Sequence, residues 1–201
     1  MVRSARRRPT GAPSLSTAGI VLLLAVGPLG AQSVDKPTAP SAPAAAQSAE
    51  EAYRKGQDFE KKQNYADAMR WYRVAAAQGN ALAQAGIGNL YAGGNGVPRS
   101  YAEAAHWWHL AAAQGNPEAQ NNVGMSYFQG WGVAQDYTQA LSWFRKAADQ
   151  GNEVAQRNIG YMYFKGLGVA PDRAAAIGWF RKAAANGDAE SKEALQQLGE
   201  K

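Results

Sequence analysis

The chain has 201 residues, of which 46% are hydrophobic and 18% charged, as in an ordinary soluble globular protein. Its net charge of +5 includes four arginines within the first eight residues, and the remainder has 17 basic against 16 acidic side chains. This near-neutral remainder excludes the basic surface that nucleic-acid binding requires. The absence of cysteine excludes disulfides and lipid attachment through a thiol.

Residues 1–31 are typical of a secretory signal peptide. A basic start precedes an apolar run at residues 18–26 and a small-residue stretch that ends near Ala31. The run is shorter than the roughly 20 apolar residues that cross a bilayer. We therefore expect cleavage after Ala31 and a periplasmic or secreted protein without membrane insertion. Leu29 stands where the signal favours a small residue, which leaves an uncleaved membrane anchor as the alternative.

Residues 32–48 are rich in proline, alanine and serine, a composition that predicts a disordered linker. Residues 49–201 then form the folded part. Tryptophan recurs there every 36 residues, and each tryptophan is followed by a second aromatic residue, an alanine pair and a glycine. Such self-similarity predicts a stack of like helical units. The tryptophans are Trp71, Trp107, Trp143 and Trp179, and the second aromatics are Tyr72, Trp108, Phe144 and Phe180.

Each unit is expected to contain two helices. The first unit occupies residues 49–80 and has a short inter-helix loop; three longer units occupy residues 81–116, 117–152 and 153–188. Asn64, Ser100, Asp136 and Asp172 are good N-caps for the second helices. A polar helix, residues 189–198, is expected to cap the C-terminal end of the stack.

The large and small residues of the repeat predict the core. Each tryptophan and its aromatic neighbour are expected to pack against the small alanine pairs, where helix backbones approach closely. On this interpretation Trp143 is a core anchor, and its replacement by alanine removes about 3 to 5 kcal/mol of stability.

Residues that could support catalysis are few. His106 and His109 are the only histidines, and the equivalent positions of the other units hold Arg70, Ser142 and Gly178 or Arg73, Arg145 and Arg181. No cysteine or third histidine is present to complete a zinc site. The paired glycines of the loops are expected to end helices rather than to bind phosphate. We expect no catalytic residue, no metal and no cofactor.

The motif "A-x-x-x-LG-x-x-Y-x-x-G-x-GV-x-x-D-x-x-x-A-x-x-W-x-x-x-AA-x-x-G" is nearly intact at residues 117–152 and 153–188. On these residues the chain resembles the Sel-one-like repeat proteins, which are relatives of the tetratricopeptide repeat. The resemblance covers about three quarters of the chain, and the first unit has the spacing of a plain tetratricopeptide repeat. It implies an all-α fold, a right-handed α-solenoid of stacked helix-turn-helix repeats.

The resemblance also implies a partner-binding site on the concave face, lined by the first helix of each unit. Apolar side chains at its centre and polar ones around them suit a peptide. Phe128 and Phe164 could instead pack against neighbouring loops. The groove residues implied are Tyr53, Gln57, Glu60, Leu82, Ala85, Asn89, Asn121, Met125, Phe128, Arg157, Tyr161 and Phe164.

Three functions remain open from the sequence. The first is a non-enzymatic protein–protein interaction module of the bacterial cell envelope, an adaptor, scaffold or regulator that binds a protein or extended peptide in the groove. The second is a secreted β-lactam-binding or hydrolysing enzyme, an activity ascribed to a cysteine-rich branch of the family, to which a chain without cysteine does not correspond. The third is an exported protein that interacts with host cells. The partner and the oligomeric state are not indicated.

Overall fold

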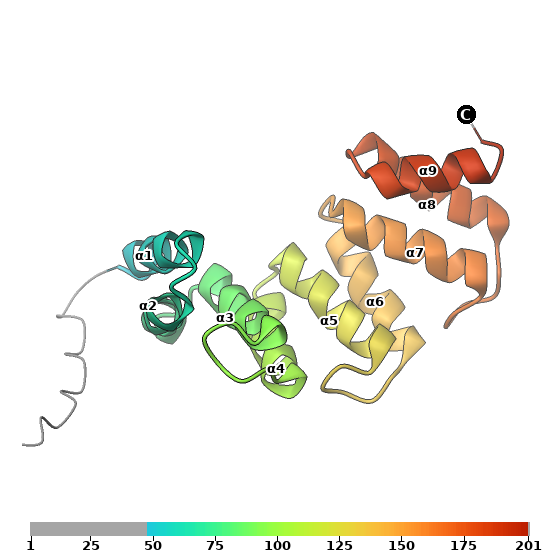
Figure 1. Ribbon diagram of the computed structural model, residues 1–201. Coiled ribbons are helices and arrows are strands. Elements are labelled where there is room, and N and C mark those ends of the chain that lie inside the picture. The colour runs from blue at the N-terminus through green and yellow to red at the C-terminus, as the bar shows by residue number, and fades with distance from the viewer. Residues whose placement is uncertain (1–47, 201) are drawn as a thin grey trace, which may run out of the picture. The chain divides into compact units, whose positions relative to one another are not determined.

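A computed structural model of the chain describes residues 48–200. These residues form helices joined by short loops and no strand, which confirms the all-α prediction (Figure 1). The predicted signal peptide, residues 1–31, and the predicted linker up to residue 47 lie outside the described residues. The helices are α1 Ala49–Lys61, α2 Tyr65–Ala77, α3 Ala81–Gly93, α4 Tyr101–Ala113, α5 Pro117–Gln129, α6 Tyr137–Ala148, α7 Glu153–Lys165, α8 Arg173–Ala185 and α9 Ala189–Gln197.

Consecutive helices pair into antiparallel hairpins, α1 with α2, α3 with α4, α5 with α6 and α7 with α8. Each hairpin packs on the next through its second helix, and α9 packs on α8, so the hairpins stack in chain order (Figure 1). This arrangement is an all-α solenoid of helix-turn-helix units. The loop of the first hairpin is residues 62–64, whereas the later loops are residues 94–100, 130–136 and 166–172.

Side-chain caps determine where each helix begins. The predicted caps Asn64, Ser100, Asp136 and Asp172 each accept a hydrogen bond from the backbone N–H three residues further on. The first helices and α9 are capped by the same hydrogen bond, accepted by Ser48, Asn80, Asn116, Asn152 and Asp188. Since a good N-cap contributes about 1 kcal/mol, the sequence specifies the start of every described helix.

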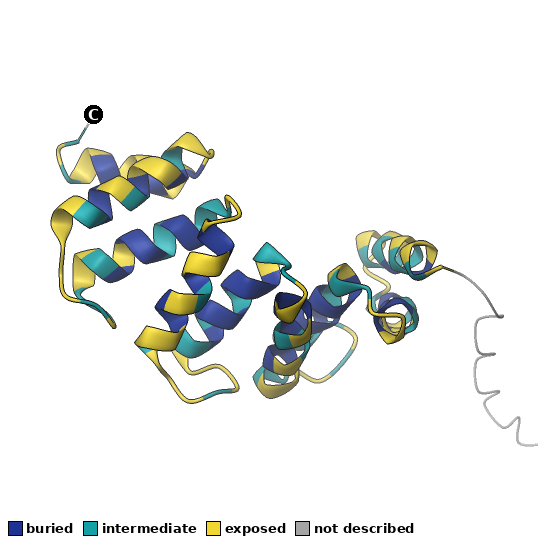
Figure 2. Ribbon diagram, turned by 180° about the vertical axis from the view of Figure 1, so that it is seen from behind, coloured by how far each residue is buried: buried dark blue, intermediate teal, exposed yellow. Residues whose placement is uncertain are grey.

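The second aromatic of each unit fills a hole over a glycine of the first helix. A Cβ added to Gly124 would lie 2.6 Å from the Phe144 ring, and one added to Gly88 would lie 2.5 Å from the Trp108 ring. Gly56 with Tyr72 and Gly160 with Phe180 repeat the arrangement. These four aromatics are at most 5% exposed. Figure 2 shows the buried positions on the helix sides that face one another.

The repeated tryptophans, predicted as core anchors, are less buried than the aromatic residues that follow them. They are half-buried, and three of them pack against a cluster that spans the preceding hairpin and the first helix of their own. Trp143, for example, packs against the cluster that contains Ala111 and Ala112. Its outer ring face is covered by Lys146, whose Nζ lies 3.7 Å from the ring centroid. Within a hairpin the second aromatic is the core residue, whereas the repeated tryptophan joins neighbouring hairpins.

Buried glutamines, which the sequence analysis did not identify, also join the hairpins. Gln120 is 6% exposed; its Nε2 donates to the carbonyl of Ala112, and its Oε1 accepts from Gln150 of the next hairpin at 2.8 Å. Gln84 with Gln114 and Gln156 with Asn186 make equivalent contacts. Because each buried amide is hydrogen-bonded, the ladder fixes the spacing of neighbouring hairpins without leaving an unpaired polar group.

Among residues 48–200, every helix is too short or too polar to span a bilayer.

Candidate interaction surface

The residues predicted to line a groove all belong to the first helices of the hairpins. These helices also contact one another directly: Asn122 of α5 donates to Asn89 of α3 at 3.3 Å, and Asn158 of α7 donates to Asn121 of α5 at 3.1 Å. The structure collects most of the predicted residues into two groups. One group is apolar and lies on α5 and α7, and the other is acidic and lies on α1, α3 and α5.

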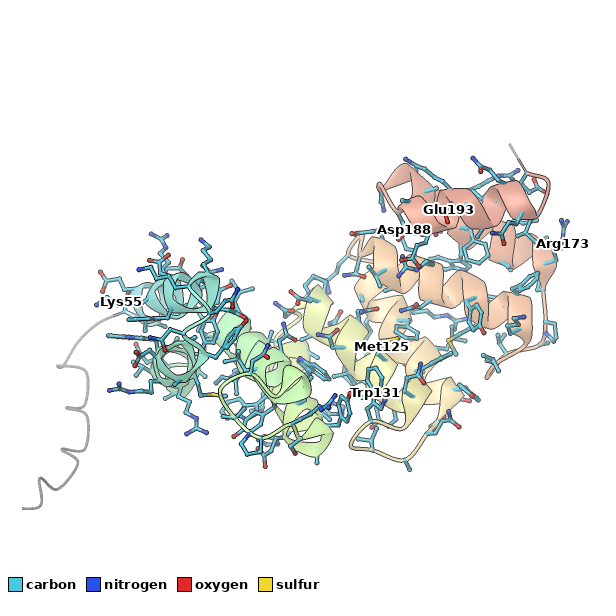
Figure 3. All side chains as sticks on the ribbon, in the orientation of Figure 1. Lys55, Met125, Trp131, Arg173, Asp188 and Glu193 are labelled. Atoms are coloured by element: carbon cyan, nitrogen blue, oxygen red, sulfur yellow. The ribbon has the colours of Figure 1, made fainter. Side chains whose placement is uncertain are left out.

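The apolar group borders two adjoining hollows. Met125, Phe128, Gln129, Asn158 and Tyr161 line a hollow of about 280 Å³ between α5 and α7. The Phe128 ring is half-buried and contacts Tyr161 edge-on, with ring centroids 6.3 Å apart. The sulfur of Met125, a residue labelled in Figure 3, lies 3.6 Å from Nδ2 of Asn158.

The second hollow, of about 270 Å³, extends from α7 to α9. Its walls include Tyr161, Phe164, Lys165 and Leu198. Tyr161 is 44% exposed and Phe164 is 41% exposed. We call the two hollows, which share Tyr161, the aromatic hollow. Adjacent exposed aromatic side chains beside a cavity are more typical of a binding surface than of a solvated one.

The predicted alternative, in which the phenylalanines pack against loops, describes Phe128 better than Phe164. Phe128 contacts Tyr137, the first residue of α6, at a centroid distance of 5.4 Å, and its carbonyl accepts from Gln135 of the loop. Phe164 is 41% exposed, and the Nζ of Lys165 lies 5.3 Å from its ring centroid. Phe164 is therefore the more accessible of the two.

The acidic group surrounds Tyr53 of α1. Gln57 donates to the Tyr53 hydroxyl at 2.8 Å, the Tyr72 hydroxyl donates to Glu60, and Asn89 donates to Glu118 at 3.2 Å. Partial burial raises the pKa of Tyr53, and the negative charges of Glu118, Glu60 and Glu50 raise it further. Burial and the Glu60 contact also raise the pKa of Tyr72. We call Tyr53, Glu60 and Glu118 the acidic end.

Some predicted groove residues are occupied by contacts within the protein. Asn121 is 8% exposed and Ala85 is 3% exposed, so both are part of the packing. Arg157 is hydrogen-bonded to Asp188 and lies 3.4 Å from Glu190, so its charge is balanced within the chain. Leu82 is 46% exposed on α3 and lines neither hollow.

Other residues of the surface were missed from the sequence. They include Glu118, Gln129, Asn158, Lys165, Ala194, Gln197 and Leu198. They were missed because the polar positions differ from one first helix to the next. Glu118 could have been found from its spacing of seven residues from Met125, which places both residues on one side of α5.

Of the two histidines, His109 takes part in packing, whereas His106 is exposed on α4. His109 contacts Trp143 and Tyr127 edge-on, with ring centroids 5.6 and 6.0 Å away. Burial lowers the pKa of His109, and His106 and Lys146 lower it further. In the part of the chain that the structure describes, no three His, Cys, Asp or Glu side chains are grouped as a metal site requires.

The helical hairpins and their repeated glycine–aromatic contacts define a repeat solenoid. The model of the Sel1 repeat matches residues 42–80, 81–116, 117–152 and 154–188, and the chain belongs to the Sel1 repeat family. Residues 42–80 show that the first unit, in spite of its shorter loop, also matches this repeat. None of the curated proteins is a significant match to the sequence.

Solved structures support this assignment. The chain is 38% identical to c5321, a protective antigen of uropathogenic Escherichia coli with an SLR fold, over 75% of this chain and 33% of that one, with a TM-score of 0.71. It is 36% identical to a Sel1 repeat protein from Oxalobacter formigenes over 69% of this chain and 57% of that one, with a TM-score of 0.66. Helicobacter pylori cysteine rich protein B shares the fold at 19% identity over 70% of this chain and 96% of that one, with a TM-score of 0.51. The chain therefore spans about a third of the first and just over half of the second.

Proposed function

We propose that this chain is a non-enzymatic interaction module of the cell envelope that holds an extended segment of a partner protein along its first helices. Sel1 repeat proteins are generally protein-interaction modules. The observation that carries the proposal is the aromatic hollow, where Tyr161 and Phe164 are each more than 40% exposed beside cavities of side-chain size. Aromatic anchors with polar neighbours are the usual energetic centre of a protein interface.

The envelope location rests on the signal peptide expected at residues 1–31, with an uncleaved anchor as its alternative. One relative favours a second role for the same surface. The uropathogenic c5321 is described as a protective antigen, and a chain 38% identical to it is a candidate for export toward host cells. In either location the interaction is with a protein.

The enzyme alternative gains no support from the serines that could act as nucleophiles. Ser126 is fully buried, and its hydroxyl donates to the carbonyl of Asn122 at 2.9 Å. Ser142 is exposed on α6, where it has neither the strand-turn-helix context nor the paired base of a catalytic serine. The likeness to the cysteine-rich protein shows the fold alone.

The test is affinity co-purification from the native envelope fraction, with the full chain as bait and mass spectrometry as readout. The variant Tyr161→Ser with Phe164→Ser removes both exposed aromatics of the hollow. Leu110→Ser is the matched control, since Leu110 is 39% exposed on α4 and lines neither hollow. A partner kept by the wild type and the control but lost from the double variant supports the proposal. A partner kept equally by all three baits contradicts it.

A further inference from the structure

The charges beside the aromatic hollow restrict the kind of segment that can bind there. Glu118 and Met125 lie seven residues apart on α5, which is two helical turns, so both side chains are on the same side of the helix. The separation along the axis is about 10 Å at 1.5 Å per residue. An extended chain covers that distance in about three residues.

The acidic end carries negative charge that the protein does not balance. Glu60 and Glu118 each accept one hydrogen bond from a neutral donor, Tyr72 or Asn89, through one carboxylate oxygen. Among residues 48–200 neither carboxylate forms an ion pair, whereas Glu50 is paired with Arg54 at 2.9 Å. The ring of Tyr53 lies beside them, half-buried. Carboxylates and an aromatic ring together favour a Lys or Arg side chain.

The other end of the surface has the opposite charge. Lys165 lines the hollow between α7 and α9, and its Nζ lies 5.3 Å from the Phe164 ring centroid. A basic side chain of the partner is repelled there and attracted at the acidic end. Because the two ends differ in sign, they also determine which end of a charged segment lies over α1.

We propose that the partner segment is an extended peptide with a bulky apolar side chain in the aromatic hollow and a Lys or Arg side chain about three residues away, placed at the acidic end. This inference rests on the proposed function, since it names the chemistry of the segment that the surface holds. The apolar residue supplies most of the binding energy, and the basic residue selects the segment and its direction.

The experiment is selection of a phage-displayed library of random dodecapeptides on the full chain, followed by fluorescence-anisotropy titration of the synthesised peptides. We expect the selected sequences to share Lys or Arg two to four positions from Phe, Trp, Leu or Met. The variant Glu60→Gln with Glu118→Gln removes both charges but keeps the acceptors for Tyr72 and Asn89. It should weaken binding about tenfold, and added salt should weaken the wild-type complex in the same way.

The control variant is Glu103→Gln with Asp149→Asn, which removes two exposed carboxylates from α4 and from the end of α6. It should bind the peptides as the wild type does, and circular dichroism should show the same helicity for all variants. If the peptides fail to bind the variant with Tyr161→Ser and Phe164→Ser but still bind the variant with Glu60→Gln and Glu118→Gln, this inference is overturned and the proposed function stands. Peptides that none of these changes affects, or a selection without binders, overturn both.

Discussion

Replacing Gly124 by alanine tests the packing that holds each hairpin together. The added Cβ would lie 2.6 Å from Cδ1 and Cε1 of Phe144, about 1 Å inside the optimal carbon–carbon separation. Phe144 is fully buried, so the ring cannot move into solvent. Overpacking of this kind costs about 1–3 kcal/mol, while alanine gains at most about 1 kcal/mol over glycine in a helix. We expect a net loss of up to about 2 kcal/mol.

Gly178→Ala is the matched control. Gly178 lies within α8, and a Cβ added there meets no atom within 4 Å. The same change should therefore stabilise the protein by about 0.5–1 kcal/mol. Urea unfolding followed by circular dichroism at 222 nm measures both variants. If Gly124→Ala is as stable as Gly178→Ala, the glycine–aromatic contact is not tight and the explanation of the repeat is wrong.

Three further predictions follow from the same geometry and from the sequence. In the same urea assay, Phe144→Ala should lower the free energy of unfolding by about 3–5 kcal/mol and Trp143→Ala by clearly less. The reason is that Phe144 is fully buried whereas Trp143 is half-buried. The reverse order would restore Trp143 as the core anchor. The pKa of His109 in the folded protein is lower than the ordinary histidine pKa near 6.5, so the unfolded chain binds more protons than the folded one as the pH falls. The free energy of unfolding of the wild type should therefore fall from pH 7.5 to pH 5 more steeply than that of His109→Gln. Equal slopes would contradict the burial of His109. Edman sequencing of the exported protein should begin at Gln32, and an intact Met1 would favour the uncleaved anchor.

Most of the fold could be predicted because its determinants are local. The N-caps and the 36-residue spacing place the helices almost to the residue, as for the terminal helix, predicted at residues 189–198 and observed at Ala189–Gln197. Which aromatic of an adjacent pair points inward could not be read from spacing. Trp143 and Phe144 are about 100° apart around the helix, and the position of the neighbouring hairpins decides which one is buried.

The candidate site was less predictable because it depends on contacts between units. Arg157 was expected at the rim of a groove, but Asp188, the N-cap of α9, takes up its charge. Asn121 is likewise buried by Asn158 of the following first helix. The predicted apolar residues do lie along two adjoining hollows, because their positions depend mainly on helix register. These residues are Met125, Phe128, Tyr161 and Phe164. Whether they bind a partner remains a prediction.

The glutamine ladder has a consequence for how such chains change length during evolution. Gln120 receives its hydrogen bond from Gln150, and Gln84 receives an equivalent one from Gln114, each across a separation of 30 residues. An in-frame duplication of one 36-residue unit adds a new donor and a new acceptor together, so every buried amide keeps a partner. Insertion of a partial unit would leave one of them unpaired inside the protein. Genes of this kind are therefore expected to lengthen by whole units, each of which extends the surface available to a partner.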